Sequence, residues 1–545
     1  MGSHVITIAD HLLNRLHEMG VKDIFGVPGD YNLQFLDYIE SSKKVKWIGT
    51  CNELNAAYAA DGYGRVKGVG AVVTTGGVGE LSAMNGIAGS YAENVAVIHI
   101  VGMPSTVIQR AKLFNHHTFA DGDFTKFIRI QQLITCANEV IELATAAVQI
   151  DTILTQCYLL QKPVVLGIAS DLFDAKITID KITPLNLALP QSNEQIQRAL
   201  VKETITKIKH ARQPLIVIDA KARNHNLIKY AKLLINKTHI PYVTTLMAKG
   251  DINEDNPQFM GEYFGKLSEK HILDYVDGSD LIIWFGRVDT DLNSAGYSTV
   301  HDYSKMLLID YNQLAFFAEM THSLNGIEFT NALTASINDY INSYHVRRHH
   351  IEATISPSLT YNTFWDYAHK LIKPDSNVLM EAGTSIFGFF NKQLPENVQV
   401  INQLLWGSIG YTVGATLGIL ASKVRVHTYL FVGDGSFQLT AQEVSTMLRH
   451  QYNPIIFLIN NHGYTIERYI HGYTRKYNEI ATWDYCGFVR SFKGELMTWK
   501  IERFEQLESL KSELDQHDDK LRFVEVILGK SEAPEVLHQI YSNKG

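Results

Sequence analysis

The sequence predicts an α/β protein with three doubly wound parallel-sheet domains. Short runs that are apolar on both faces recur along the chain, which is typical of buried strands in parallel sheets. Segments with helical spacing of apolar residues separate these runs, as expected for helices that cover both faces of such sheets. The chain has 545 residues. At about 150 residues per domain, this length favours three or four domains over a single core.

The elements are expected to alternate from the N-terminus onward. Ile8, Leu12 and Leu16 fall on one helical face. Gly20 ends this helix, and a short strand and turn with the sequence DIFGVPGD follow. The other buried strands are expected at residues 71–75, 95–101, 163–168, 215–218, 281–285, 429–432, 455–459 and 523–527.

Two polar stretches, at 174–193 and 346–358, interrupt the alternation of strands and helices. Both contain proline, which favours a linker between domains. They predict domains at 1–180, 190–345 and 357–545. Gly-rich turns with polar residues are concentrated in the first and last of these, so we expect the chemistry there.

The composition disfavours several classes of protein. Lys and Arg number 49 against 57 Asp and Glu, a formal charge of −8, so nucleic-acid phosphates are poor partners. The four cysteines form no CxxC pair that would suggest a zinc site. The MGSH start lacks the features of a signal peptide, and we expect a cytoplasmic protein. Residues 397–422 are uncharged, but their polar side chains favour a buried segment beside a ligand over a membrane span.

The strongest pattern for a ligand site is in the last third of the chain. The sequence GDGS at 433–436 follows one apolar strand, and the asparagine pair at 460–461 follows the next, with 24 residues between GDG and NN. Parallel strands end at the same edge of a sheet, where open α/β sheets bind ligands. The side-chain oxygens of Asp434 and Asn461 and the carbonyl oxygen of Gly463 suit a Mg²⁺ ion that also binds a diphosphate.

Each of these turns alone is common in loops, but the pair at this spacing indicates a metal–diphosphate site. The spacing resembles the cofactor signature of thiamine-diphosphate-dependent enzymes. YTIE at 464–467 and IHG at 470–472 resemble their 2-oxo acid decarboxylases, which include pyruvate and indolepyruvate decarboxylases. The resemblance implies a pyrimidine-binding domain, a central domain without cofactor and a diphosphate-binding domain, with thiamine diphosphate and Mg²⁺ as cofactors. It places the metal on Asp434, Asn461 and Gly463 and further cofactor contacts at Thr384, Gly407, Ser408, Ile409, Gly435, Ser436 and Ile466.

Five residues are candidates for proton transfer. Glu53 begins an Ala-rich helix, where an acid usually does no more than interact with the helix dipole. His116 and His117 lie in a polar turn, and such pairs are often surface residues. The resemblance implies catalytic roles instead. Glu53 would bond N1′ of the cofactor's pyrimidine, Glu467 would act at the decarboxylation step, and Asp30 with the two histidines would protonate and release the product.

The predicted substrate pocket leaves room for groups larger than the methyl group of pyruvate. Ile386 stands where some pyruvate-specific relatives carry Trp, and Ile466 precedes Glu467. A pocket gains about 0.8 kcal/mol per buried methylene, so branched, aromatic or long-chain 2-oxo acids would be favoured without sharp exclusion of pyruvate. The pocket candidates are Ile386, Ile466, Leu292, Gly76 and Ile540.

We therefore expect a carboxy-lyase that converts a 2-oxo acid to an aldehyde and CO₂. The resemblance implies active sites between the first domain of one subunit and the third domain of another, and hence a dimer or a homotetramer built as a dimer of dimers. Two alternatives stay open. A carboligase or acetohydroxyacid synthase would share the cofactor site, although the histidine pair and Glu467 count against it. A non-catalytic diphosphate-binding assembly protein would not need the acids and histidines named above.

Overall fold

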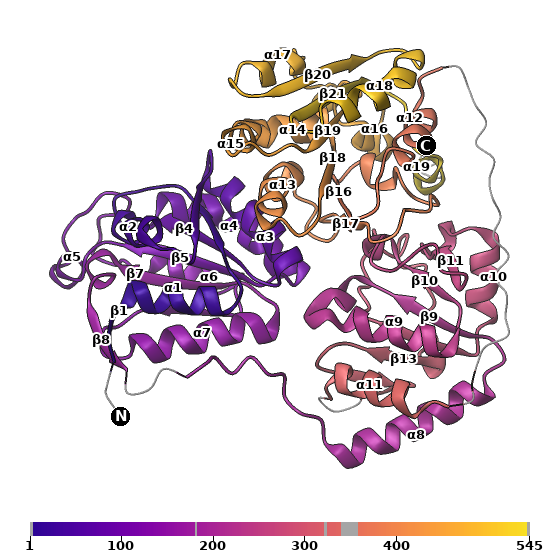
Figure 1. Ribbon diagram of the computed structural model, residues 1–545, viewed down its shortest axis with the longest axis horizontal. Helices are drawn as coiled ribbons and strands as arrows, with labels where there is room; N and C mark the ends of the chain where they lie inside the picture. The colour runs from indigo at the N-terminus through magenta and orange to yellow at the C-terminus, as the bar shows by residue number, and fades with distance from the viewer. Residues whose placement is uncertain (1–3, 180–182, 321–323, 339, 341–357, 542–545) are drawn as a thin grey trace.

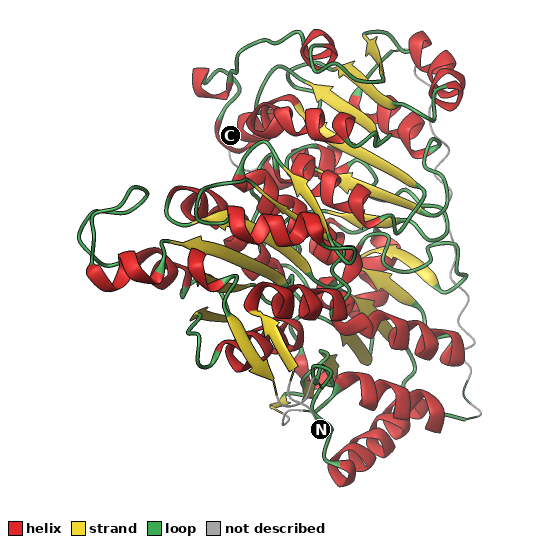
Figure 2. Ribbon diagram, turned by 60° about the vertical axis from the view of Figure 1, so that its left-hand side comes forward, coloured by secondary structure: helices red, strands yellow, loops and turns green. Residues whose placement is uncertain are grey.

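The computed structural model describes residues 4–179, 183–320, 324–338, 340 and 358–541. Figure 1 shows three α/β domains, the first in indigo and purple, the central one in magenta and red, and the third in orange and yellow. Helices lie on the faces of each sheet, as the view coloured by secondary structure in Figure 2 also shows. The predicted fold class is confirmed.

The first domain contains a parallel sheet with the strand order β3-β2-β4-β5-β7-β6. Every residue of β4, β5 and β7 is buried, because helices cover both faces of the sheet. An antiparallel pair, β1 with β8, lies outside this sheet. The elements are β1 (His4–Thr7), α1 (Ile8–Glu18), β2 (Asp23–Gly26), α2 (Leu33–Ser41), β3 (Lys46–Gly49), α3 (Glu53–Lys67), β4 (Gly70–Thr75), α4 (Val78–Glu93), β5 (Val97–Met103), α5 (Thr106–Ala111), α6 (Lys126–Gln131), β6 (Ala137–Val140), α7 (Ala146–Leu160), β7 (Val164–Ala169) and β8 (Lys176–Ile179).

The central domain differs from the prediction at one edge of its sheet. The strand order is β11-β10-β9-β12-β13-β14-β15, and β14 and β15 are antiparallel to their neighbours. Only short connections link β13, β14 and β15, and such connections can join antiparallel strands but not parallel ones. The elements are α8 (Glu194–His210), β9 (Pro214–Ile218), α9 (Leu227–Thr238), β10 (Tyr242–Thr244), β11 (Phe259–Glu262), α10 (Lys270–Gly278), β12 (Leu281–Phe285), β13 (Met306–Ile309), β14 (Leu314–Phe316), β15 (Glu319–Met320) and α11 (Gly326–Ser336).

The third domain repeats the parallel arrangement, with the strand order β17-β16-β18-β19-β21-β20. The neighbours β18 and β19 lie inside the sheet and are almost wholly buried. The elements are α12 (Tyr361–His369), β16 (Ser376–Met380), β17 (Gln399–Ile401), α13 (Tyr411–Ser422), β18 (His427–Gly433), α14 (Asp434–Thr440), α15 (Val444–Arg449), β19 (Ile455–Asn460), α16 (Thr465–His471), α17 (Tyr485–Arg490), β20 (Leu496–Ile501), α18 (Glu505–Gln516), β21 (Leu521–Ile527) and α19 (Glu535–Tyr541).

Helices α3 and α13 join the first domain to the third (Figure 1). A Cβ atom on Gly62 of α3 would lie 2.4 Å from the carbonyl oxygen of Ala415. One on Gly418 of α13 would lie 1.8 Å from the carbonyl oxygen of Ala59. Glycine at these positions therefore allows the two backbones to approach more closely than side chains would permit.

The uncharged stretch at 397–422 forms β17, a loop and the buried helix α13. Among the described residues, no helix combines the length and the hydropathy that a bilayer crossing requires. The part that forms α13 is mostly apolar because this helix is enclosed by α3 and by the third domain's own sheet.

We predict that Gly418→Ala lowers the free energy of unfolding by about 1–3 kcal/mol, the usual cost of overpacking, because the new methyl group meets a backbone oxygen that cannot rotate away. Thermal unfolding of the purified variant measures this. Gly433→Ala is the matched control, since among the described residues no atom lies within 4 Å of its added Cβ and its φ is −72°. Equal melting temperatures for the two variants would contradict the prediction.

Candidate active site

The carboxyl ends of β18 and β19 bring the predicted metal ligands together. The strands are parallel neighbours with Gly433 opposite Ile459, so the segments that follow them leave the sheet at the same edge. Asp434 is buried. Its carboxylate accepts hydrogen bonds from the backbone N–H groups of Gly435 and Gly463 at 2.9 and 3.0 Å. These bonds give both carboxylate oxygens a defined orientation.

The Asn461 side chain adds a third oxygen to the cluster. Its Oδ1 lies 2.8 Å from the Gly463 carbonyl oxygen and 3.3 Å from Asp434 Oδ1. Acceptor oxygens without a proton between them repel one another, and a rotated amide would relieve this by donating its N–H groups. A cation relieves it as well. Neighbouring ligands about 2.1 Å from an octahedral Mg²⁺ are about 3 Å apart, so the observed spacing and the oxygen donors fit this metal.

The electrostatics of Asp434 agree with a cation site. Burial raises the pKa of this carboxyl to about 6, because the charged form loses its hydration. A divalent cation beside it would favour the charged form again.

Glycine is required beside these ligands. Gly463 has a φ of +121°, and a Cβ there would lie 2.2 Å from the Asn478 carbonyl oxygen. A Cβ on Gly435 would lie 2.5 Å from the Tyr464 ring. The two glycines therefore let the turns after β18 and β19 pack against their neighbours.

A cavity of about 170 Å³ adjoins Asp434, and its lining residues all lie in the third domain. The segment 479–482 and Lys530 line it, and sequence analysis did not single them out. Lys530 follows the end of β21, which pairs with β19. Its position after a buried strand was a signal that could have identified it. Of the other predicted contacts, Thr384 and Ser436 are buried.

In the first domain, Asp30, His116 and His117 form a second polar cluster. His116 Nε2 lies 2.6 Å from Asp30 Oδ2, and His117 Nε2 lies 3.9 Å from Asp30 Oδ1. Tyr31 stacks on His116 with ring centroids 5.2 Å apart and donates its hydroxyl to the His116 carbonyl oxygen at 2.8 Å. The side chains of Asp30 and His116 are 46% and 58% exposed, so this cluster is open to solvent in the single chain.

Glu53 lies near the same loop. It is the first residue of α3, which Asn52 caps. A Cβ on Gly79 would lie 2.9 Å from Glu53 Oε1, and a Cβ on Gly77 would lie 2.0 Å from the His117 carbonyl oxygen. Gly77 and the first turn of α4 therefore lie between His117 and Glu53.

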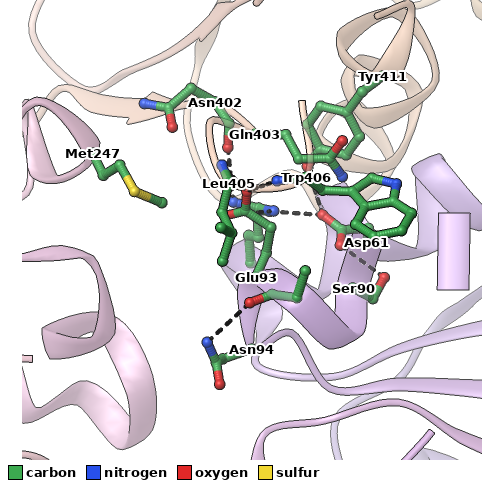
Figure 3. A network of polar contacts seen from close by, with 12 residues as sticks. Asp61, Ser90, Glu93, Asn94, Met247, Asn402, Gln403, Leu405, Trp406 and Tyr411 are labelled. Atoms are coloured by element: carbon green, nitrogen blue, oxygen red, sulfur yellow. Dashed lines mark hydrogen bonds and ion pairs between the residues drawn. The ribbon is translucent and has the colours of Figure 1, made fainter. Parts of the chain in front are cut away.

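Polar side chains of α3 and α4 contact the segment 402–411 of the third domain (Figure 3). The cofactor contacts predicted at 407–409 lie in the middle of this segment. Asp61 accepts hydrogen bonds from the hydroxyls of Tyr411 at 2.6 Å and Ser90 at 2.8 Å. Arg65 donates to Asp61 at 2.6 Å and to a backbone carbonyl of the segment at 2.9 Å. These buried contacts connect the two domains.

The other half of this network holds the segment's backbone. Glu93 Oε1 accepts hydrogen bonds from the N–H groups of Leu405 and Trp406 at 2.9 and 3.2 Å. The Trp406 indole donates to Asn85 at 2.8 Å, and Asn85 donates to Ser408 Oγ at 3.0 Å. Sequence analysis missed Asp61, Arg65, Asn85 and Glu93, since their partners lie more than 300 residues away along the chain.

Glu381 is a further buried acid that sequence analysis did not single out, although it follows β16 at the same sheet edge. Its Oε2 accepts hydrogen bonds from Thr412 Oγ1 at 2.7 Å and from the Gly410 N–H at 3.2 Å. Burial raises its pKa to about 7. Glu381 thereby ties the start of α13 to the sheet.

Four of the five substrate-pocket candidates lie in one apolar cluster. Ile386 is buried there, and Leu292, Ile466 and Ile540 are partly buried against the same cluster. Gly76 lies instead in the first domain, where its N–H donates to the backbone of β5 at 2.7 Å. The cluster therefore combines Leu292 of the central domain with three residues of the third, and Gly76 is separate from it.

The proton-transfer candidates are divided between domains as well. Glu467 is exposed in the first turn of α16 in the third domain, whereas the other four belong to the first. Among the described residues, none from the first domain lines the cavity beside Asp434. A larger cavity of about 1180 Å³ at the junction of the three domains is lined by none of the predicted site residues.

The chain matches three parts of one enzyme family. Residues 6–126 match the N-terminal TPP binding domain of thiamine pyrophosphate enzymes, 201–321 their central domain and 383–526 their C-terminal TPP binding domain. The pyruvate decarboxylase of Candida glabrata is 37% identical over 545 residues, covering 97% of this chain and 96% of that protein. Pyruvate decarboxylase isozyme 2 of Saccharomyces cerevisiae is 37% identical, with coverage of 98% and 97%. A putative pyruvate decarboxylase of Schizosaccharomyces pombe is 38% identical, with coverage of 98% and 97%.

We predict that Glu381 makes stability depend on pH. Its folded-state pKa of about 7 exceeds the ordinary value, so its stabilising effect is fully present below about pH 4.5 and is lost as the pH rises through 7. The difference in free energy of unfolding between wild type and Glu381→Gln should therefore change by about 1.4 kcal/mol per pH unit across this window. Urea unfolding at pH 5 and pH 7.5 measures it. Glu508→Gln, at an exposed acid of α18, is the control, and a difference independent of pH for Glu381→Gln would contradict the prediction.

Proposed function

The chain belongs to the thiamine pyrophosphate enzymes as a relative of pyruvate decarboxylases, and we propose that it releases CO₂ from 2-oxo acids without oxidation and leaves an aldehyde. Thiamine diphosphate and Mg²⁺ are its cofactors in this proposal. The observation that carries it is the convergence of the Asp434 carboxylate, the Asn461 side-chain amide and the Gly463 carbonyl at the sheet edge. This arrangement fits a metal that binds a diphosphate.

The third domain would hold the cofactor's charged end. Asp434, Asn461 and the Gly463 carbonyl would bind Mg²⁺, and Gly435 and Ser436 follow directly and would contact the diphosphate. The network around 402–411 supports this, because it sets the backbone of the segment in which the remaining contacts are predicted.

The residues of the chain would supply position and protons. When bound, thiamine diphosphate supplies the electron sink that accepts the bonding electrons as CO₂ leaves. Glu53 would hold a proton at the pyrimidine nitrogen. Asp30 and His116, in contact at 2.6 Å, would share a proton that His117 helps deliver to the product, and Glu467 would act at the decarboxylation step. A relay of carboxyl and imidazole groups suits this work, because both kinds of group can take up and release a proton within hydrogen-bond distance.

We propose further that each active site lies between two copies of the chain. The first domain carries the proton relay and the third carries the metal ligands, and within one chain they do not line the same cavity among the described residues. Apolar side chains are exposed near both parts, on α4 of the first domain and on α14 of the third. Val78 and Leu81 of α4 are 52% and 40% exposed, and Leu439 of α14 is 51% exposed. Exposed apolar groups of this kind favour a protein interface.

The preferred substrates would be larger than pyruvate, without sharp exclusion of pyruvate itself. The pocket candidates Ile386, Ile466, Leu292 and Ile540 share one apolar cluster, and all four are aliphatic. Branched, aromatic or long-chain 2-oxo acids would gain from burial there, at about 0.8 kcal/mol per methylene.

The test is CO₂ release from a series of 2-oxo acids with thiamine diphosphate and Mg²⁺. We predict release that requires both cofactors and that Asp434→Asn and Glu53→Gln each abolish. Chains of the two variants, co-expressed, should recover roughly a quarter of wild-type activity, because half of the random dimers are mixed and one of their two sites is intact.

Three outcomes would contradict parts of this proposal. Absence of CO₂ from every 2-oxo acid, with cofactor bound, would favour a non-catalytic assembly protein. Acetoin-type products in place of aldehydes would favour a carboligase. An inactive mixture of the two variants, each able to associate, would place the whole site within one chain.

We predict that Ile386→Trp shifts the preference toward pyruvate. Filling the pocket removes the gain from each methylene, a factor of about 4 in kcat/KM per methylene at about 0.8 kcal/mol. The ratio of kcat/KM for a branched 2-oxo acid to that for pyruvate measures this. Val426→Trp, at a position that is 79% exposed, is the control, and an unchanged ratio for Ile386→Trp would contradict the assignment.

A further inference from the structure

Four buried polar side chains of the first domain form a continuous chain of hydrogen bonds. Gln131 Nε2 donates to Glu80 Oε1 at 2.8 Å. His99 Nδ1 lies 2.9 Å from Gln131 Oε1, and His99 Nε2 lies 2.9 Å from Thr74 Oγ1. The four residues come from α4, α6, β5 and β4 and are all buried. These hydrogen bonds therefore cross the interior of the domain from α4 to the middle of the sheet.

The carboxylate at one end determines the direction of every bond. In its charged form Glu80 can only accept, so the amide nitrogen of Gln131 then faces it and the amide oxygen faces His99. His99 then carries its proton on Nδ1, and its Nε2 accepts from the Thr74 hydroxyl. Burial lowers the pKa of His99 to about 4, which keeps the ring neutral as this arrangement requires.

The other oxygen of Glu80 binds the turn before α4. The Gly77 N–H donates to Glu80 Oε2 at 3.2 Å. Gly77 has φ +71° and ψ −100°, a conformation that needs glycine. A Cβ on Gly77 would lie 2.0 Å from the His117 carbonyl oxygen, and one on Gly79, in the first turn of α4, would lie 2.9 Å from Glu53 Oε1.

We propose that Glu80 is a positioning residue for the decarboxylation: held by Gln131, His99 and Thr74, it fixes the turn against which Glu53 and His117 are set. This inference rests on the proposed function, since it takes Glu53 and His117 as catalytic. Stabilising the start of α4 does not by itself explain the arrangement. A solvent-exposed glutamate at this helix position could accept the same N–H bond without the cost of burying a carboxylate. A fully bonded buried network instead defines one geometry.

The test is an exchange of side chains along the chain of hydrogen bonds. In Glu80→Gln, the amide at 80 faces the amide of Gln131. The direction of the hydrogen bonds must therefore reverse, or one hydrogen bond is lost. In Glu80→Gln with Gln131→Glu, the amide at 80 donates to the carboxylate at 131, which also accepts from His99. Every hydrogen bond is restored while the charge moves by one residue.

We predict that Glu80→Gln lowers kcat by about 10- to 100-fold, as a small misplacement of catalytic groups does, and that the exchange variant recovers most of this loss. In a His117→Ala background, Glu80→Gln should have a smaller further effect, because the part of its effect that acts through His117 is already lost. Steady-state CO₂ release by cofactor-loaded protein, with melting temperatures, measures these effects. Asp219→Asn, at an equally buried acid of the central domain, should lower the melting temperature without changing kcat.

The outcomes separate this inference from the proposed function. Wild-type kcat in Glu80→Gln, full additivity with His117→Ala, or an exchange variant as slow as Glu80→Gln would each overturn the positioning role. If Glu80→Gln does not fold, the exchange variant and Thr74→Val, which removes the last donor of the chain, carry the test. Full activity in Glu53→Gln and His117→Ala would instead overturn the catalytic roles on which the inference rests.

Discussion

The close packing of α3 against α13 is the constraint on which the rest of the structure depends. The two backbones approach within a distance that Gly62 and Gly418 permit and larger residues would not. This contact places the N-terminus of α3, where Glu53 begins the helix, at a fixed position relative to the third domain. It also brings the polar faces of α3 and α4 against the segment 402–411. The polar contacts there can form because the apolar helix pair has already set the domains side by side.

Buried carboxylates recur around the site, and each is compensated in a different way. Asp434 has two backbone N–H donors and a geometry that fits a cation. Glu381 accepts from a hydroxyl and from backbone N–H groups at the start of α13. Glu80 has an amide and a backbone N–H, supported by a longer chain of hydrogen bonds. Burial raises the pKa of all three. The free-energy cost of burying each carboxylate is offset by its hydrogen-bond partners.

The division of polar groups between domains is the basis for the proposed site between two copies of the chain. The candidate metal ligands directly follow strands of the third domain, whereas Asp30 and His116 lie in loops of the first domain. Each part is ordered by contacts inside its own domain. A second copy of the chain could therefore bring two preformed halves together without rearranging either.

The sequence by itself determined the fold class, most of the buried strands and the turns that carry the candidate metal ligands. Runs such as 455–459 are apolar on both faces, and GDG and NN each follow such a run, so local pattern was sufficient to place them at one sheet edge. The antiparallel strands β14 and β15 and the segment 479–482 escaped prediction, because they are short or carry no periodic signal. The network of Asp61, Arg65 and Glu93 and the hydrogen-bond chain from Glu80 were decided by the tertiary structure alone. Their partners lie on other elements, and a polar residue in a helix looks the same along the chain whether it meets water or a buried partner. Folding distinguishes the two, because desolvation makes an unpaired buried group costly and so selects the arrangement in which each donor finds its acceptor.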